Sequence, residues 1–392
     1  MPSIVSWPPA APAIARHVHP VLFRSRQDDN DTVLTPGQRP IWWLSWAAAL
    51  YEVGTRLRAS GYEHGWFARR ELPVPTISIG NLTVGGTGKT PLVIEITDWL
   101  LGAGRKVGVL SRGYRRTSRE PQLLVSDGAR ILATPEQAGD EPFLIAQRCP
   151  RAVVAVGADR YRLGRRVLEE CGVDCLVLDD GYQHLGLHRD VNLLLVDATD
   201  GPGLERPLPA GRLREPITAA KRATGVIITR AETRNQVDDV LRRLGSAVDP
   251  LPPTAQVVFR AKELVSVTTG TSQFREWCQG KRAFLVSGVG HAASFRGTAE
   301  ELGVTILGEV AYPDHYAYSV NDVETLRKRA ADLKADMMLT TEKDAAKIRP
   351  YLAPEDDSWW AARLRVEWRM GESMMRGMIL GARPTTGRGA GG

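Results

Sequence analysis

A lysine and a threonine directly after a glycine-rich stretch form the pattern most clearly suited to chemistry. In VGGTGKT, Gly85, Gly86 and Gly88 precede Lys89 and Thr90. Glycines allow successive backbone N–H groups to converge on an anion, while the lysine reaches the β- and γ-phosphates and the threonine hydroxyl binds Mg²⁺. The pattern therefore predicts a loop that binds the phosphates of ATP. Its expected residues are Thr83, Val84, Gly85, Gly86, Thr87, Gly88, Lys89 and Thr90.

The residues on either side of this loop favour phosphate binding over a glycine-rich surface turn. A β-branched run that includes Thr76, Ile77 and Ile79 precedes the loop, and an apolar pattern typical of a helix begins near Thr90. A helix that starts there adds the positive end of its dipole to the anion site. The strict pattern has glycine where this chain has Thr83, so the interpretation depends on the strand, loop and helix occurring together.

Two adjacent carboxylates, Asp179 and Asp180, follow the apolar run CLVL. Carboxylates at the end of a strand beside a phosphate loop commonly hold Mg²⁺, either directly or through water. A DDG turn that merely closes a strand is the alternative, and the phosphate loop favours the metal interpretation.

Candidates for accepting a proton from a hydroxyl substrate occur in two segments. Asp140 and Glu141 lie in AGDEPFLIA, and Asp314 precedes His315 in AYPDHYAY. A carboxylate or a histidine can act as general base when phosphate moves to a hydroxyl. Each residue also suits a helix start or a satisfied polar contact, so the residues alone leave the identity of the base open.

Basic and aromatic residues occur in two further loops. Arg112 and Tyr114 lie in SRGY, whereas Arg212, Arg214 and Glu215 lie in PAGRLREP. A guanidinium group there could stabilise the γ-phosphate. The glycine and proline content is equally typical of a surface turn.

The composition is that of an ordinary globular protein of 392 residues, long enough for two α/β domains. The formal net charge of +6 arises from 51 Lys plus Arg against 45 Asp plus Glu, spread along the chain. This charge does not indicate a nucleic-acid partner, because an anionic membrane or a phosphorylated substrate explains it equally well. Four cysteines without metal-ligand spacing and the lack of a recognisable signal peptide favour reduced thiols in the cytosol.

The N-terminal part of the chain divides into two segments. Residues 1–39 are rich in Pro, Ala and Arg without a sustained period, which predicts a disordered extension. Residues 40–72 are expected to form a helix and a linker, and the apolar run 41–51 is about half as long as a bilayer-spanning helix. The tryptophans Trp42, Trp43 and Trp46 favour a helix that lies in the membrane interface, with packing on the protein's own core as the alternative.

The remaining pattern predicts an α/β fold like that of P-loop NTPases, with a mostly parallel sheet and helices on both faces. Near-continuous Val, Ile and Leu runs alternate with helical patterns, as in VNLLLVDA and TGVIITRAET. The turn signal DPLPP predicts a boundary between a core of residues 73–253 and a smaller C-terminal α/β domain of residues 254–375. Residues 376–392 are expected to be a flexible tail.

Taken in order, these motifs resemble those of the tetraacyldisaccharide 4'-kinase family. The resemblance covers roughly residues 42–348 and depends on LPVPTISIGNLTVGGTGKTP, LSRGY, GDEPFLIA, DDGYQH, LPAGRLREP, YPDHY and TTEKDAAK. It implies transfer of the ATP γ-phosphate, with Mg²⁺, to an acylated glucosamine disaccharide lipid during lipid A synthesis. It also implies a position on the anionic cytoplasmic face of the bacterial inner membrane, and no obligate protein partner is expected.

The resemblance assigns roles to individual residues. It implies that Lys89 and Thr90 bind phosphate and Mg²⁺, and that Asp179 and Asp180 lie at the metal. It further implies that Asp140 is the general base, tuned by His315, which Asp314 orients. Tyr114, Arg214 and Glu215 match positions near the transferred phosphate or the acceptor. The chain departs from the family at Arg115, where glycine is frequent, and at His291–Ala292, where Asn-Pro is frequent.

Two other classes of protein remain as alternatives. A P-loop GTPase or metallochaperone needs a guanine-reading Asn/Thr-Lys-x-Asp element, whereas this chain has ITRAE at residues 228–232. A soluble small-molecule kinase acting on another hydroxyl would have the tryptophan-rich helix packed on its core.

Overall fold

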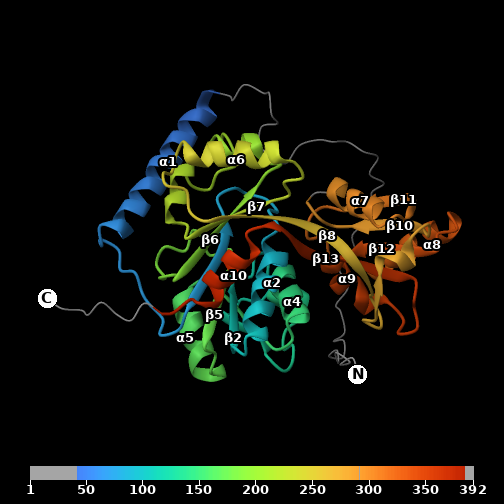
Figure 1. Cartoon of the computed structure of the whole chain (residues 1–392). Coiled ribbons are helices and arrows are strands. Elements are labelled where there is room, and N and C mark those ends of the chain that lie inside the picture. Colours follow the sequence, from blue (N-terminus) through green and yellow to red (C-terminus); the bar gives the residue numbers. More distant parts are fainter. Residues whose placement is uncertain (1–41, 291, 385–392) are drawn as a thin grey trace.

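The structure is a computed structural model that describes residues 42–290 and 292–384. The expected extension, residues 1–39, lies outside the described residues. Within these ranges, all the strands belong to one thirteen-stranded sheet in the order β11-β10-β12-β13-β8-β7-β6-β1-β5-β2-β4-β3, with β9 paired to β8. Figure 1 shows two groups of helices around this sheet, joined by the long strands β8 and β13.

The half that carries the phosphate loop is built on a parallel sheet. Its parallel strands are β1 (Thr76–Asn81), β2 (Val107–Ser111), β4 (Val153–Gly157), β5 (Cys175–Asp179), β6 (Val191–Asp197) and β7 (Gly225–Thr229). β3 (Gln122–Asp127) pairs antiparallel with β4 at the edge. These parallel strands are buried along their whole length, which explains their continuous Val, Ile and Leu runs.

Helices cover both faces of this half. They are α2 (Lys89–Gly102), α3 (Pro135–Ala138), α4 (Asp140–Arg148), α5 (Arg160–Cys171) and α6 (Arg234–Gly245). α2 and α4 pack with one face of the strands in the largest apolar cluster, while α5 and α6 belong to separate clusters. The predicted fold class, an α/β protein with a mostly parallel sheet, is confirmed.

The second half joins the first through an antiparallel pair of long strands. β8 (Thr254–Ser266) pairs with β7 at its beginning and with β13 (Trp359–Met370) along most of its length, and β13 in turn pairs with β12. The expected boundary at 253/254 therefore falls inside a continuous sheet, because β8 belongs to both halves. Treating the halves as separate domains remains a prediction.

The second half contains its own parallel strands and helices. The strands are β10 (Arg282–Ser287), β11 (Thr305–Ala311) and β12 (Met337–Thr341), with the short β9 (Ser272–Phe274) beside β8. The helices are α7 (Ala292–Glu301), α8 (Val320–Asp332) and α9 (Glu342–Ile348). α9 follows directly from β12, so its first turn lies at the carboxyl end of a parallel strand, where ligands bind in such sheets.

The end of the chain returns to the first half. α10 (Glu372–Leu380) buries Met375 and Ile379 in the cluster that contains α2, and Trp368 of β13 stacks on Trp99 with ring centroids 5.2 Å apart. The expected tail of residues 376–392 is thus wrong for residues 376–380, which are helical. Their apolar side chains have a partner surface on α2 that the local sequence does not reveal.

The N-terminal helix α1 (Trp42–Glu63) extends well beyond the apolar run that predicted it. Leu44 and Ala48 pack on Ala210, whereas Trp46 and Leu50 are 69% and 73% exposed. Among the described residues, no helix has both the length and the apolar character needed to cross a bilayer. Packing on the core and an exposed apolar side therefore coexist in one helix.

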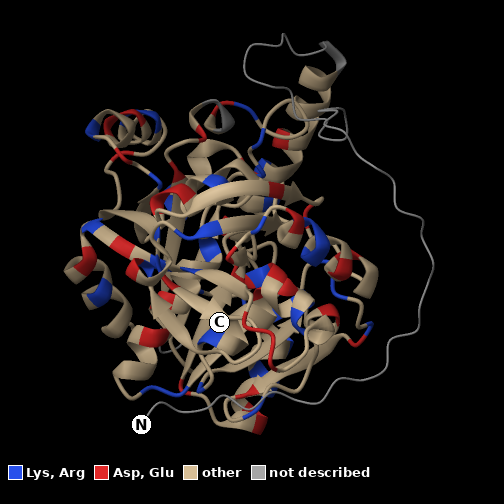
Figure 2. Ribbon diagram, turned by 90° about the vertical axis from the view of Figure 1, so that its right-hand side faces the viewer, with Lys and Arg blue, Asp and Glu red and all other residues tan. Residues whose placement is uncertain are grey.

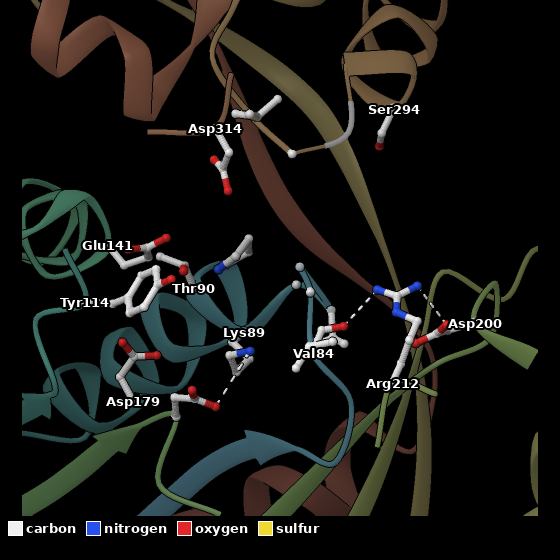
Figure 3. A pocket seen from close by; sticks show the side chains of 18 of the residues that line it. Val84, Lys89, Thr90, Tyr114, Glu141, Asp179, Asp200, Arg212, Ser294 and Asp314 are labelled. Carbon is white, nitrogen blue, oxygen red and sulfur yellow. Dashed lines mark hydrogen bonds and ion pairs between the residues drawn. The ribbon is translucent and has the colours of Figure 1, made fainter. Parts of the chain in front are cut away.

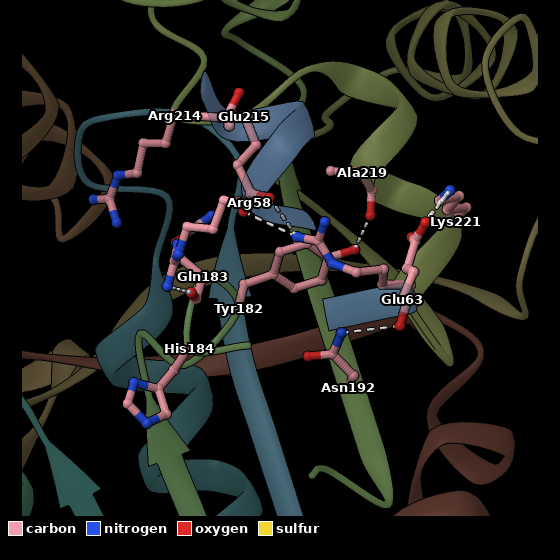
Figure 4. A network of polar contacts seen from close by, with 12 residues as sticks. Arg58, Glu63, Tyr182, Gln183, His184, Asn192, Arg214, Glu215, Ala219 and Lys221 are labelled. Atoms are coloured by element: carbon pink, nitrogen blue, oxygen red, sulfur yellow. Dashed lines mark hydrogen bonds and ion pairs between the residues drawn. The ribbon is translucent and has the colours of Figure 1, made fainter. Parts of the chain in front are cut away.

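Polar contacts tie α1 to the first half (Figure 4). Arg58 Nη2 donates to the Gln183 carbonyl at 3.3 Å, and Glu63 pairs with Lys221 at 3.1 Å. The Tyr51 hydroxyl donates to the carbonyl of Arg214 at 2.9 Å. Figure 2 shows that basic and acidic residues are interspersed along the ribbon.

Candidate active site

The phosphate loop connects β1 to α2 in a conformation that requires glycine at two positions. Gly85 and Gly88 have φ values of 113° and 83°, a region that residues with a Cβ rarely adopt. A Cβ on Gly88 would also lie 2.2 Å from the ring of Phe259 in β8. Thr83, which stands where the strict pattern has glycine, is buried and forms an isolated antiparallel bridge with Leu213. That bridge accommodates a side chain at this position.

A second loop braces the phosphate loop from the side (Figure 3). Arg212 Nη2 donates to the carbonyl of Val84 at 2.8 Å, and Arg212 Nη1 lies 2.9 Å from Asp200 Oδ1. The backbone N–H of Val84 donates to the Arg212 carbonyl at 2.8 Å. The guanidinium that the sequence offered as a phosphate ligand is thus engaged in holding the loop.

Lys89 and Thr90 begin α2 at the base of the pocket. Lys89 Nζ donates to Asn81 Oδ1 at 3.0 Å and lies 3.7 Å from Asp180 Oδ1. Burial lowers the pKa of Lys89, although the neighbouring Asp180 opposes that shift. Sequence reasoning missed Asn81, whose signal was a polar residue at the end of the strand that leads into the loop.

Asp179 and Asp180 lie beside this lysine but have different environments. Ser111 Oγ donates to Asp179 Oδ2 at 2.8 Å, and burial together with Asp180 raises the pKa of Asp179 to about 6. Burial would raise the pKa of Asp180 as well, but Lys89 and Arg214 outweigh it and lower the pKa of that carboxyl. Arg214 Nη1 lies 2.8 Å from Asp180 Oδ2. The two adjacent carboxyl groups therefore differ in pKa, and Asp180 holds its negative charge more firmly than Asp179.

These residues fit a magnesium ion that is bound together with nucleotide. The buried Asp180 Oδ1 accepts no hydrogen bond from the described residues, so an acceptor oxygen is available. No cluster of three or more His, Cys, Asp or Glu side chains suited to a metal occurs in the described ranges 42–290 and 292–384. Mg²⁺ needs no such cluster, because it usually keeps several waters and shares one or two carboxylates with substrate phosphates. Thr90 would supply a hydroxyl ligand to such an ion.

Asp140 and His315, 175 residues apart in sequence, meet across the two halves. His315 Nδ1 lies 3.0 Å from Asp140 Oδ2, and His315 Nε2 lies 3.6 Å from Asp314 Oδ2. The hydrogen bond with Asp140 raises the pKa of His315. Burial favours protonation of Asp140, but His315 and Lys347 outweigh it and lower the pKa of Asp140. The three residues proposed from the sequence as base and partners therefore form one contiguous group.

Helix α9 supplies further charges that sequence reasoning did not select. Lys343 pairs with Glu141, and Lys347 Nζ lies 3.2 Å from Asp140 Oδ2. Glu342 forms an ion pair with Arg148 of α4 at 2.7 Å. Helices α4 and α9 thus meet through complementary charges. These residues lie in the segment TTEKDAAK, whose polar composition by itself predicts only the start of a solvent-exposed helix.

The other predicted substrate residues occupy different positions around the pocket. Tyr114 is 61% exposed, and its ring centroid lies 5.8 Å from that of His315. Arg214 contacts Asp180, whereas Glu215 is buried and bound by Arg222 at 2.7 Å. Glu215 therefore lies in the wall of the pocket with its charge already compensated. Arg112 also lines the pocket.

A cleft of about 2260 Å³ lies between the two halves, and Lys89, Asp180 and His315 are among the residues that line it. Asp140 contacts this lining through His315. In Figure 3, Asp314 and Ser294 face the phosphate loop from the opposite side. The arrangement places a phosphate loop and paired carboxylates on one wall and a carboxylate–histidine pair at the junction of the halves. The arrangement therefore suits a nucleoside triphosphate with its metal ion, and it also offers a group that can accept a proton.

A phosphate loop at the carboxyl edge of a parallel α/β sheet, with paired aspartates and a separate carboxylate–histidine pair, defines the class of P-loop phosphotransferases. Comparison with known proteins specifies the family. The chain belongs to the tetraacyldisaccharide-1-P 4'-kinase family, whose model matches residues 40–381.

Relatives and a solved structure agree with this assignment. The tetraacyldisaccharide 4'-kinase of Syntrophus aciditrophicus is 38% identical over 307 residues, which is 76% of this chain and 82% of that protein. That of Anaeromyxobacter sp. is 36% identical over 347 residues, covering 85% and 92%. The crystal structure of the Aquifex aeolicus enzyme LpxK in complex with ATP is 31% identical, covers 86% of this chain and 98% of that chain, and has a TM-score of 0.70.

The segment ITRAE, where a GTPase would read guanine, is engaged in other contacts. Arg230 pairs with Asp197 at 2.5 Å, and Glu232 forms two hydrogen bonds with Arg260 at 2.7 and 2.9 Å. Together with the family assignment, this argues against the GTPase alternative.

Proposed function

We propose that the protein transfers the γ-phosphate of ATP to the 4'-hydroxyl of tetraacyldisaccharide 1-phosphate, forming lipid IVA in lipid A biosynthesis. The new bond joins the hydroxyl oxygen to the γ-phosphorus, the bond from that phosphorus to the β-phosphate oxygen breaks, and ADP leaves. The observation that carries the proposal is the contact between Asp140 and His315, since His315 lines the same cleft as Lys89.

ATP with Mg²⁺ is the phosphate donor. The phosphate loop from Thr83 to Thr90 is proposed to cradle the phosphates, with Lys89 turning from Asn81 and Asp180 toward them. Thr90, Asp179 and Asp180 would hold the magnesium ion, whose charge offsets that of the transferred group. The brace of Arg212 and Asp200 keeps the loop in its binding conformation.

Asp140 is proposed to accept the proton of the attacking hydroxyl. It is kept ionised by His315 and Lys347, and its position in the first turn of α4 fixes its direction. Asp314 orients the His315 ring through Nε2. Tyr114 and Arg214 are proposed to contact the acceptor or the transferred phosphate, and Glu215 would act by fixing Arg222 in the wall.

Transfer of labelled γ-phosphate from ATP to singly phosphorylated tetraacyl disaccharide in detergent micelles tests this function. We expect label in the lipid, dependent on Mg²⁺. Hydrolysis of ATP by the folded protein without labelled lipid would contradict the proposed acceptor, and a strong preference for GTP would contradict the proposed donor.

We propose further that α1 brings the protein to the anionic cytoplasmic face of the inner membrane. Trp46, Leu50, Val53 and Leu57 are exposed at spacings of four, three and four residues, so they form one stripe along the helix. The opposite side of α1 packs on the core and contributes Tyr51, Thr55 and Arg58 to the cleft. A helix immersed on its exposed side would place the cleft beside the lipid substrate.

The double substitution Leu50→Ser and Leu57→Ser is expected to weaken binding to vesicles that contain anionic lipid. Each exposed leucine would contribute about 1.5–3 kcal/mol when the membrane buries it, so losing both predicts a reduction of at least tenfold. Co-sedimentation with vesicles measures this, and the exposed pair Arg165→Ser and Glu169→Ser on α5 is the control. Equal vesicle binding by both double variants would contradict a membrane role for the stripe.

A further inference from the structure

Lys347 is an unusual lysine, because it is buried between two carboxylates that come from different halves of the molecule. Its side chain is 8% exposed, and Nζ lies 3.2 Å from Asp140 Oδ2 in α4 and 3.5 Å from Asp344 Oδ1 in α9. Burying an ammonium group is costly unless it is paired, so both carboxylates stabilise its charged form in this place.

Asp344 holds Lys347 in position because its own carboxylate is fixed. Asp344 is fully buried, and its Oδ2 accepts hydrogen bonds from the backbone N–H of Gly288 at 2.9 Å and from Thr341 Oγ1 at 2.7 Å. Gly288 also accepts a hydrogen bond from the backbone N–H of His315 at 3.3 Å. The ends of β10 and β12 therefore hold both groups that contact Asp140: Lys347 through Asp344, and His315 through its backbone.

Both cations meet the same oxygen of Asp140. His315 Nδ1 at 3.0 Å and Lys347 Nζ at 3.2 Å contact Oδ2, so the carboxylate plane is held by two bonds to one oxygen. Oδ1 takes part in neither contact and is the oxygen left for the incoming hydroxyl. A general base must be held within hydrogen-bond reach and in the correct direction before the reaction begins.

The charged and titratable groups around Asp140 come from both halves of the molecule. From its own helix comes Glu141, which is paired with Lys343. The neighbouring groups of the second half are His315, Asp314, Lys343, Asp344 and Lys347, and those of the loop after β2 are Tyr114 and Arg115. Lys347 is the lysine among them that contacts Asp140 directly.

We propose that Lys347 is a positioning residue for phosphate transfer, which holds Asp140 ionised and directed at the acceptor hydroxyl. The inference rests on the proposed role of Asp140 as base. Burial of a carboxyl group favours its neutral form, and an opposite charge within about 4 Å favours the ionised form. Without the ammonium group, less charge opposes the effect of burial, so Asp140 becomes protonated at a higher pH than in the unmodified protein.

The test is the pH profile of kcat/KM for lipid phosphorylation, measured for the unmodified protein, Lys347→Gln and Lys347→Arg. For Lys347→Gln we expect the acid limb to move up by about one pH unit, since one close opposite charge shifts a carboxyl pKa by about 1–3 units. Activity should fall about tenfold on that limb and match that of the unmodified protein at pH values above it. Lys347→Arg keeps the charge and should restore the original limb.

Lys343→Gln is the matched control. Lys343 lies on the same helix and at the same junction, but it pairs with Glu141. Both Lys343→Gln and Lys347→Gln should lower the melting temperature, because each removes an ion pair, but only Lys347→Gln should move the acid limb. Should Lys347→Gln fail to fold, Lys347→Met, which keeps a long apolar stem, provides the same comparison.

An unmoved acid limb in folded Lys347→Gln would overturn the inference, as would equal movement in Lys343→Gln. Loss of activity in Lys347→Gln at every pH would also overturn it, because that result assigns Lys347 a structural or directly catalytic role. Absence of lipid phosphorylation by the unmodified protein would instead refute the proposed function, so the two failures are distinguishable.

Discussion

Replacing Lys89 with alanine is expected to lower the rate of lipid phosphorylation by about 10²–10³-fold. A preorganised cationic or hydrogen-bond donor aimed at developing charge contributes about 2.7–4 kcal/mol to transition-state stabilisation. Lys89 is such a group, since it is buried at the start of α2 and fixed by Asn81 and Asp180. Initial rates of labelled phosphate transfer at saturating ATP measure the effect.

The control for this substitution is Lys106→Ala, which removes an exposed lysine of the same half. We expect its rate to match that of the unmodified protein. A rate for folded Lys89→Ala within a few-fold of this control would show that the lysine does not contact the transferred phosphate, and the assignment of the loop would have to be revised.

The substitution Asp140→Asn is expected to reduce kcat by about 10²–10⁴-fold, the range typical of general-base catalysis. Asparagine keeps the size of the side chain and can still accept a hydrogen bond, but it cannot take the proton. ATP affinity should change little, because Asp140 lies in α4 and outside the phosphate loop. Single-turnover phosphate transfer and equilibrium binding of ATP provide the two measurements.

Glu136→Gln, a nearby exposed carboxylate in α3, is the matched control and should retain full turnover. Parallel losses of turnover and ATP affinity in Asp140→Asn would assign Asp140 to nucleotide or metal binding. Unchanged turnover would exclude it as the base.

The nucleotide part of the site could be predicted from the sequence because its residues are close together. Gly85, Gly88, Lys89 and Thr90 form one short loop, and its preceding strand and following helix are visible as periodic patterns. The position of Asp179 at the carboxyl end of a strand follows from the same logic. These elements needed no knowledge of long-range contacts.

The pairing of Asp140 with His315 could not be derived from local patterns. The two residues are 175 positions apart, and their meeting depends on how β8 and β13 fix the second half against α4. Only the family resemblance predicted it. Lys347 was missed for a related reason, because a lysine in a polar helix is usually solvated, and its burial follows from the packing of α9 on α4.

The same limit applies to the domain description, in which the tail was wrong for residues 376–380 and the boundary after residue 253 remains a prediction. DPLPP is a strong turn signal, but the strand after it pairs with β7 and continues the sheet. The run MMRGMIL in residues 374–380 is short, and nothing nearby in the sequence shows that α2 receives it. The partners of both segments are distant in sequence, so local patterns do not reveal them.

The return of β13 and α10 to the first half bears on how the protein matures during synthesis. Trp99 and the rest of α2 emerge from the ribosome well before Trp368, Met375 and Ile379, which cover them. The nascent chain therefore carries an uncovered apolar surface until β13 and α10 have been made. A chain that terminates prematurely before Trp368 would keep that surface open, and cellular proteases would be expected to remove such fragments.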